Sequence, residues 1–121
     1  MSTHPIVHVE ISAIDRKVSS KFYEDVFGWK VQHIDDMNYT TFMPGSGVEG
    51  GFNPVTKDYP AGTVTVYIET EDVTASLKAV EAAGGTTLVP ESDIPGVGKF
   101  GMFRDPAGNM IGLIKNIPQP G

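Results

Sequence analysis

Two polar side chains near the start of this sequence have the types and the spacing for chemistry. His8 and Glu10 are two positions apart, and apolar residues flank them on both sides. This alternation predicts a β-strand, which rises about 3.3 Å per residue and places His8 and Glu10 on one face. An imidazole beside a carboxylate can bind a divalent metal ion or exchange a proton. The pair is therefore the first candidate for a metal or acid–base site.

The composition leaves few other chemistries open. The 121 residues include no cysteine, which excludes thiolate nucleophiles, disulfides and cysteine-held metals. The net charge is −6, and no basic cluster is dense enough to neutralise a row of phosphates. Residues 45–50 match the dinucleotide pattern G-x-G-x-x-G, but Pro54 follows where that motif needs a helix, so we interpret them as a hairpin turn. We expect no nucleic-acid partner.

The strand that carries His8 belongs to an internal repeat. At an offset of about 57 residues, Val7–Ile11 aligns with Val64–Ile68, and roughly eight identities fall in about 25 positions. In each half an acidic residue follows the strand and can cap a helix, Asp15 in the first and Asp72 in the second. Glycines stop both helices, and short strand-like segments separated by turn residues follow. Each half therefore predicts a β-α-β-β-β module of an α+β protein.

Apolar stripes on the two predicted helices indicate how the modules pack. Val18, Phe22 and Val26 recur every four residues in the first helix, and a similar stripe starting at Val73 and Leu77 runs along the second. We expect both stripes to pack on the valine faces of the strands. We also expect Trp29 to pack at the junction of helix and sheet. The later strands are predicted at 29–34, 39–43, 48–52, 86–89, 99–104 and 110–114.

One domain over residues 1–121 accommodates this pattern, because each module alone is too small to bury a full core. Module 1 covers about 6–53, a linker rich in proline and glycine about 54–62, module 2 about 63–116 and a tail 117–121. The first residues lack the basic start and apolar stretch of a leader, and no window approaches the roughly 20 apolar residues of a membrane span. We expect a cytoplasmic protein with no membrane partner.

Three motifs in this order resemble the glyoxalase/bleomycin-resistance/dioxygenase superfamily, also called vicinal oxygen chelate proteins. They are His8 followed by Asp15, the run 22–29 (FYEDVFGW), and 104–109 (RDPAGN) before the last strand. The resemblance covers about residues 6–116. It implies that the paired modules form an open, cupped mixed β-barrel with helices packed outside, whose inner face holds substrate and often a divalent metal. It also implies a homodimer.

The resemblance further implies up to four metal ligands, one from the first and last strand of each module. His8 matches the first ligand. Thr65 falls at the second module's histidine position and Gly112 at its glutamate position, and neither is a suitable donor. Glu49 is the one acid near the last strand of module 1. We therefore expect no metal or other cofactor, with a divalent ion held by His8 and Glu10 as the alternative.

These observations predict a small-molecule-binding protein with a degraded metal site, which could serve resistance or sequestration. The net charge of −6 favours a cationic ligand. Two alternatives stay open: a metal-dependent lyase, isomerase or dioxygenase related to lactoylglutathione lyase, and a non-catalytic dimeric interaction domain. The expected ligand pocket is lined by His8, Glu10, Thr65, Tyr67, Glu69, Phe100 and Met102, with Tyr39 as a further aromatic candidate.

Overall fold

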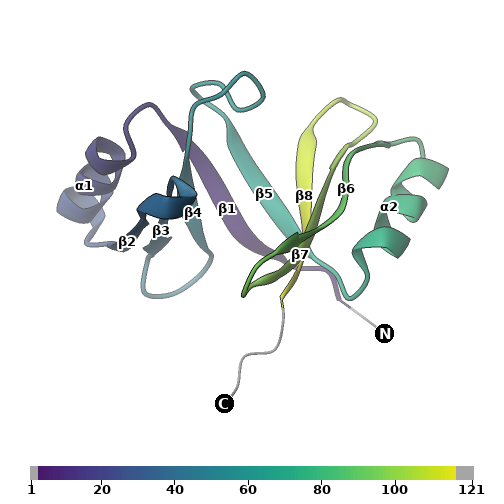
Figure 1. The fold of residues 1–121 in the computed structure, drawn as a ribbon, viewed down its shortest axis with the longest axis horizontal. Helices are drawn as coiled ribbons and strands as arrows, with labels where there is room; N and C mark the ends of the chain where they lie inside the picture. The colour runs from purple at the N-terminus through teal and green to yellow at the C-terminus, as the bar shows by residue number, and fades with distance from the viewer. Residues whose placement is uncertain (1–2, 117–121) are drawn as a thin grey trace, which may run out of the picture. The chain divides into compact units, whose positions relative to one another are not determined.

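The computed structural model describes residues 3–116 and contains two α-helices, one 3₁₀ turn and eight strands (Figure 1). In chain order these are β1 (Ile6–Ala13), α1 (Arg16–Phe27), β2 (Lys30–Ile34), the 3₁₀ turn Asp35–Met37, β3 (Tyr39–Met43), β4 (Glu49–Pro54), β5 (Val64–Glu69), α2 (Val73–Ala82), β6 (Thr86–Ile94), β7 (Gly98–Arg104) and β8 (Met110–Asn116). The tail predicted over 117–121 lies outside the described residues. Within residues 3–116, neither helix is long and apolar enough to span a bilayer.

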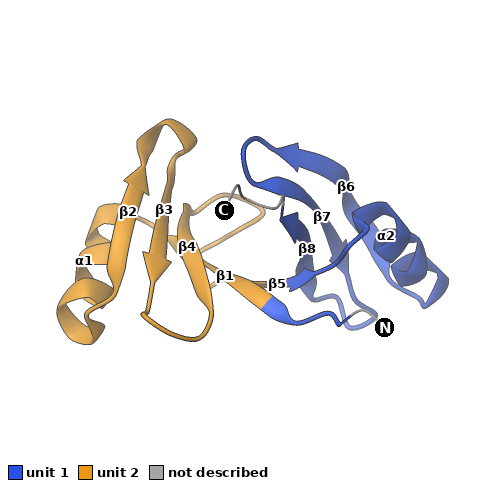
Figure 2. Ribbon diagram, turned by 90° about the horizontal axis from the view of Figure 1, so that it is seen from below, with its two compact units in different colours: residues 1–6, 67–121 blue, residues 7–66 orange. Residues whose placement is uncertain are grey.

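The chain forms two compact units (Figure 2). The N-terminal unit comprises residues 7–66, and the C-terminal unit comprises residues 67–116 together with residues 3–6. Strands run in the order β2-β3-β4-β1 in the first and β5-β8-β7-β6 in the second. The first strand of each module pairs in parallel with its last strand, and the other pairs are antiparallel. The prediction of an α+β protein built from two β-α-β-β-β modules is confirmed.

Helix capping follows the sequence signals. The Asp15 carboxylate accepts hydrogen bonds from the backbone N–H groups of Lys17 and Val18 at the start of α1. Asp72 does the same for Ala75 at the start of α2. Helix α1 ends at Gly28, whose φ of 70° is the left-handed conformation that glycine adopts without steric cost. These caps satisfy backbone groups that a helix end otherwise leaves unpaired.

Each helix covers one face of its own sheet and forms one core there. In the C-terminal unit the core contains Val73, Leu77, Phe103 and Leu113, so the stripe on α2 packs inward. It packs on β7 and β8 rather than on the predicted valine face of β5, whose Val64 is 60% exposed. In the N-terminal unit the core contains Ala13, Phe42 and Phe52, with Tyr23 and Trp29 packed against it. The Trp29 ring lies 4.7 Å from that of Tyr23 and 4.6 Å from that of Phe42, which confirms its place at the helix–sheet junction.

The prediction for the first helix is wrong. Val18, Phe22 and Val26 are 67%, 54% and 55% exposed, whereas Ser20 is buried and Tyr23 contacts the core. The sheet already presents the large aromatic rings of Phe42 and Phe52. One tyrosine and a small serine on α1 fill the remaining space, so the apolar stripe faces away from the sheet.

Strand β6 is also longer than predicted: it was expected to end at Val89 and continues to Ile94. Pro90 cannot donate a ladder hydrogen bond, and the sequence pattern therefore indicated an end at this point. The pairing with β7 instead shifts register between Val89 and Ser92, and this irregularity carries the strand past the proline.

A matched pair of valines tests the two helix orientations. Val73→Ala removes a side chain with no exposed surface and should lower the free energy of unfolding by about 2 kcal/mol. Val18→Ala trims a side chain that is 67% exposed and should change it by less than about 0.5 kcal/mol. Urea denaturation followed by circular dichroism measures both values. Equal losses would contradict the outward orientation of the α1 stripe.

Candidate functional site

The candidate site lies on the face of the N-terminal sheet opposite α1, which we call the helix-free face. Strand β1 presents His8, Glu10 and Ser12 on this face, as the period-two pattern predicts. The parallel pairing with β4 sets His8 beside Glu49, Glu10 beside Gly51 and Ser12 beside Asn53. Tyr39 reaches the same face from β3, since Thr41 pairs with Gly51. Local strand geometry therefore gathers polar groups from three strands.

Tyr39 connects the two chemical groups that the sequence singled out. Its hydroxyl lies 2.8 Å from Nε2 of His8 and is also hydrogen-bonded to the Glu10 carboxylate. His8 Nε2 and Glu10 Oε2 are 4.0 Å apart. An ionised carboxylate can only accept, so the Tyr39 O–H donates to Glu10 and the His8 Nε2–H donates to the Tyr39 oxygen. This chain of bonds holds the three side chains in one arrangement.

Partial burial sets the protonation states. The side chains of His8 and Glu10 are 26% and 16% exposed. Burial lowers the pKa of His8 from its ordinary value near 6.5, although the Glu10 and Glu49 carboxylates oppose this shift. Burial, followed by the charge of Glu10 and the hydrogen bond to it, raises the pKa of Tyr39 well above its ordinary value. At neutral pH the site therefore holds a neutral imidazole and a protonated phenol.

The connector after β4 adds a second phenol. Tyr59 is half-buried, and its backbone is fixed by hydrogen bonds to Thr56 in both directions. Burial raises the pKa of Tyr59, and the Glu10 charge raises it further, so this ring lies within the field of the same carboxylate. Among the residues that the structure describes, two buried side-chain oxygens of this face have no hydrogen-bond partner. They are Ser12 Oγ and Asn53 Oδ1. A ligand or water that reached them would gain hydrogen bonds.

A glycine makes room for the Tyr39 ring. A Cβ at Gly51 would lie within 2.5 Å of three atoms of Tyr39, a distance that no side chain tolerates. Gly51 has an ordinary backbone conformation and is buried, so close packing rather than a turn accounts for it. The tyrosine thus occupies the space in which a side chain from β4 would project.

The C-terminal unit repeats this arrangement. Gly112 of β8 pairs with Tyr67 of β5, and a Cβ at Gly112 would collide with the Tyr67 ring. Met102 pairs with Gly112 and is 1% exposed, and Phe100 lies two positions along the same face. Thr65, Tyr67 and Glu69 share one face of β5, on which Thr65 and Tyr67 are buried. The predicted lining residues of this module therefore share the face opposite α2.

The comparisons with known proteins give the family. The glyoxalase/bleomycin resistance protein/dioxygenase superfamily model matches residues 5–113. A glyoxylase-like domain-containing protein from Didymella fabae is 34% identical over 84% of this chain and 85% of its own. The fold class defined above is that of the superfamily, and the chain belongs to it.

Two further similarities bear on the fold and on the size of relatives. The anthracycline biosynthesis protein DnrV of Streptomyces peucetius is 30% identical over 82% of this chain. The matched region spans only 42% of the length of DnrV. The methylmalonyl-CoA epimerase of Mycobacterium tuberculosis superimposes with a TM-score of 0.70 at 17% identity, covering 93% of this chain and 88% of its own. The second similarity shows the shared fold.

The residues present do not fit the metal site that this family implies. The register makes Gly51, opposite Glu10, the counterpart of Gly112, opposite Tyr67, so both last strands carry glycine where an acidic ligand is expected. A tyrosine ring fills the space above each glycine. Over residues 3–116, no three histidine, aspartate or glutamate side chains gather closely enough to hold an ion.

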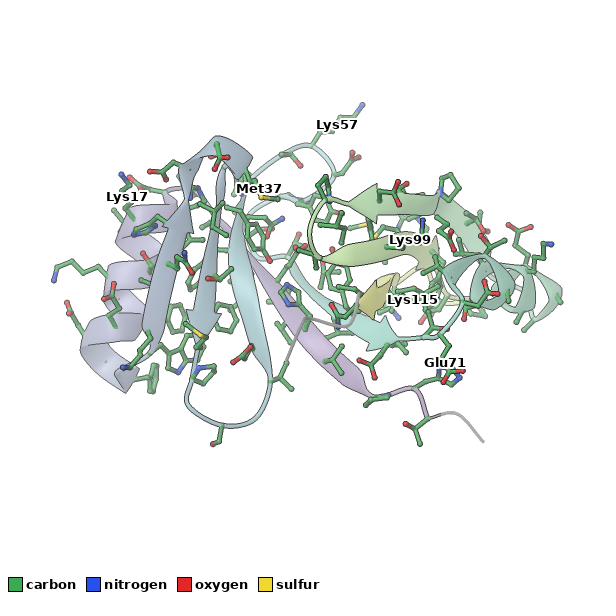
Figure 3. The ribbon with its side chains drawn as sticks, turned by 60° about the horizontal axis from the view of Figure 1, so that its bottom comes forward. Lys17, Met37, Lys57, Glu71, Lys99 and Lys115 are labelled. Carbon is green, nitrogen blue, oxygen red and sulfur yellow. The ribbon has the colours of Figure 1, made fainter. Side chains whose placement is uncertain are left out.

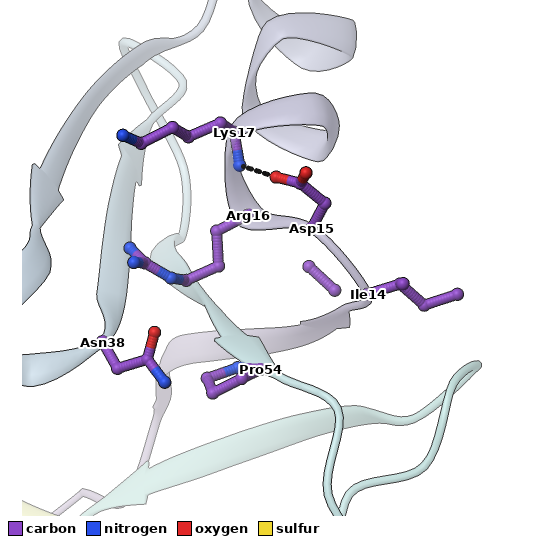
Figure 4. Close-up of a pocket in the computed structure, with 7 residues that line it drawn as sticks. Ile14, Asp15, Arg16, Lys17, Asn38 and Pro54 are labelled. Atoms are coloured by element: carbon purple, nitrogen blue, oxygen red, sulfur yellow. Dashed lines mark hydrogen bonds between the residues drawn. The ribbon is translucent and has the colours of Figure 1, made fainter.

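A separate pocket of about 240 Å³ lies at the start of α1, lined in part by Asp15, Arg16, Lys17 and Asn38 (Figure 4). The Arg16 guanidinium donates to Thr40 Oγ1 at 2.8 Å and pairs with Asp35 at 3.3 Å. The carboxylate of Asp15 already accepts from the free N–H groups of the helix. Arg16 therefore links the helix start to the 3₁₀ turn, and the free N–H groups of the helix are taken up by its own cap.

Sequence reasoning found His8 and Glu10, and the structure brings them together with Tyr39. It missed the hydroxyl that links them, and it missed Tyr59, Gly51 and Asn53. The alternation in β1 placed Ser12 on the face of His8 and Glu10, although Ser12 was not predicted to line the pocket. The contact between Tyr39 and Gly51 has no local signal, because it depends on the register of two strand pairs.

The protonation of His8 gives a direct test. Its pKa, measured by NMR titration of the ring protons, should lie below 6.5, and Glu10→Gln should lower it further by removing the carboxylate that opposes burial. Because the folded chain binds fewer protons than the unfolded chain as the pH falls through 6.5, the free energy of unfolding should decrease below that pH. A His8 pKa that rises in Glu10→Gln would contradict this electrostatic picture.

The contact between Tyr39 and Gly51 can be tested by a double-mutant cycle. Gly51→Ala should lower the free energy of unfolding by about 1–3 kcal/mol, because the new methyl group overlaps the tyrosine ring. In a Tyr39→Ala background the same substitution should cost less, and the difference is the coupling between the two positions. Chemical denaturation of the four proteins measures it. Additive losses would show that the ring does not occupy the space above Gly51.

Proposed function

We propose that this chain is a small-molecule-binding protein whose helix-free face holds an organic cation without a resident metal. The observation that carries the proposal is the Tyr39 ring over Gly51, with its hydroxyl joined to His8 and Glu10. This arrangement replaces a metal-ligating acid with a hydrogen-bonded cluster. A sequestering or resistance role would require only binding of the ligand and no reaction. We propose that the protein acts in the cytoplasm.

The charges of the site support a cationic ligand. The Glu10 and Glu49 side chains both lie close enough to His8 to raise its pKa, and burial still leaves the imidazole neutral at pH 7. The cluster therefore carries net negative charge. The chain as a whole carries −6. An ammonium group that approached Glu10 would form a charge-assisted hydrogen bond, and the nearby faces of Tyr39 and Tyr59 would add cation–π attraction. Ser12 Oγ and Asn53 Oδ1 would pair with hydroxyl or amine groups further along the molecule.

The relatives suggest where to look for such a ligand. DnrV is named as an anthracycline biosynthesis protein, and the family model includes bleomycin resistance proteins in its name. Anthracyclines with an amino sugar combine a flat aromatic system with an ammonium group, which suits two phenol rings beside a carboxylate. We therefore propose this ligand chemistry for the chain, with doxorubicin as the probe.

Doxorubicin fluorescence offers a binding assay that depends on this cluster. Quenching should give saturable binding to the wild-type chain, and Glu10→Gln should weaken it about tenfold or more, because the ammonium group loses its charged acceptor. Tyr39→Phe should weaken it less, since only one neutral hydrogen bond is lost. Parallel titrations with bleomycin show whether a different cationic antibiotic is preferred.

Glu81→Gln is the matched control, because it removes one negative charge from the exposed side of α2, where a glutamine oxygen can still accept from Thr87. It should leave the affinity within about twofold of the wild type. Equal weakening by Glu81→Gln and Glu10→Gln would assign the effect to overall charge rather than to the cluster. Absence of saturable binding for both antibiotics would reject the ligand class.

A further inference from the structure

Within residues 3–116, two neighbouring side-chain oxygens on the helix-free face are buried without a hydrogen-bond partner, and we call them the oxygen pair. They are Ser12 Oγ on β1 and Asn53 Oδ1 on β4, and the parallel register sets the two residues side by side. A buried oxygen without a donor costs free energy, because it has lost its hydrogen bonds to water and gained none in exchange. Native structures seldom keep such groups without a reason.

We propose that the oxygen pair is a second anchor for the ligand, which selects cations that carry an N–H or O–H donor about 7 Å from the ammonium group. The inference rests on the proposed function, in which Glu10 binds that ammonium group. Glu10 alone would accept any amine. The oxygen pair would distinguish amino alcohols and diamines from simple alkylamines, and Ser12 and Asn53 would thus determine specificity.

The strands around the oxygen pair hold it in place without satisfying it. The Ser12 N–H donates to the Thr63 carbonyl at 3.0 Å, and Asn53 belongs to the ladder between β1 and β4. These contacts fix the backbone and use neither side-chain oxygen. The preceding residues on the same face are Glu10, whose carboxylate accepts rather than donates, and Gly51, which has no side chain. Neither neighbour can therefore supply the missing donor.

The chemistry of the oxygen pair defines which end groups it can bind. An amide oxygen only accepts, whereas a hydroxyl can accept or donate. An amine placed between the two oxygens can donate one N–H to each. A hydroxyl can donate to Asn53 and accept from Ser12. A carbonyl or carboxylate would instead bring a further acceptor against the amide oxygen, so the oxygen pair selects end groups that donate.

Strand geometry sets the distance between the two anchors. Glu10 and Ser12 are two residues apart on β1, which is about 7 Å at about 3.3 Å per residue. Glu10 Oε2 lies 4.0 Å from Nε2 of His8, so the carboxylate leans toward His8 and away from Ser12. With bonds of about 1.5 Å, a chain of about five carbons in extended form separates its end groups by this distance, as in 5-amino-1-pentanol.

The charges near the connector favour a donor over an acidic group at the second anchor. Burial raises the pKa of Tyr59, and the charges of Glu10 and Asp58 raise it further. Lys57 is the basic residue of the connector, and it is exposed, with a side chain that projects away from the strands (Figure 3). The potential over this part of the face is therefore negative.

Calorimetric titration with two amines of equal carbon number tests the oxygen pair. 5-Amino-1-pentanol should bind the wild-type chain at least about fivefold more tightly than n-pentylamine, because its hydroxyl pairs with oxygens that a methyl end leaves unsatisfied. The variant Ser12→Ala/Asn53→Leu should bind both amines equally and keep the wild-type affinity for n-pentylamine. Ser46→Ala, at an exposed turn position, is the control and should keep the wild-type preference.

Unfolding of the ligand-free protein separates a binding role from a structural one. Ser12→Ala removes a hydroxyl that has no partner in the described part of the chain, so the urea midpoint should stay unchanged or rise. A serine that supported the fold through its hydroxyl would give a lower midpoint, and that result would overturn the proposal. Ser12→Ala should also weaken the preference for the amino alcohol without any loss of folding.

The outcomes distinguish this inference from the proposed function. Equal affinities of the wild type for the two amines overturn the second anchor, and the proposed function survives if Glu10→Gln still weakens both. In that case the oxygen pair holds an internal water only. A preference that persists in Ser12→Ala/Asn53→Leu overturns the second anchor as well, because another group then recognises the donor. If neither amine binds, the second anchor and the cation site are both rejected.

Discussion

Packing of the Tyr39 ring against Gly51 determines what the helix-free face of the N-terminal unit can offer a ligand. The ring needs the absence of a side chain at position 51, and in return it brings a hydroxyl between His8 and Glu10. Without that hydroxyl, the imidazole and the carboxylate would be a loose pair 4.0 Å apart. The absence of a side chain at Gly51 of β4 thus permits a hydrogen-bonded cluster in which His8 is neutral and Tyr39 is protonated.

The same contact between a tyrosine ring and a glycine of the last strand occurs in both units. Tyr67 lies on Gly112 as Tyr39 lies on Gly51, although the two tyrosines come from different strands of their modules. The superfamily topology is therefore present, with a phenol ring against a glycine of the last strand in each unit. Since a fold does not fix a function, the chemistry of this chain has to be argued from these rings and their hydrogen bonds.

Much of the fold could be predicted from the sequence, because its signals are local. Strand alternation, the caps at Asp15 and Asp72 and the stop at Gly28 act over a few residues, and all were confirmed. The orientation of α1 was not predictable from its periodicity, which says that one side is apolar but not what covers it. The link through Tyr39 was not predictable either, because it requires the β1–β4 and β3–β4 registers together.

Metal binding by the purified, chelator-treated chain is the most direct test of this account. Calorimetric titration with Zn²⁺, Ni²⁺ and Mn²⁺ should show no stoichiometric binding that depends on His8. The reason is that glycine stands where the family's acidic metal ligand is expected in both modules, and a tyrosine ring covers each glycine. One ion bound per chain with micromolar or tighter affinity, lost in His8→Ala, would contradict the account.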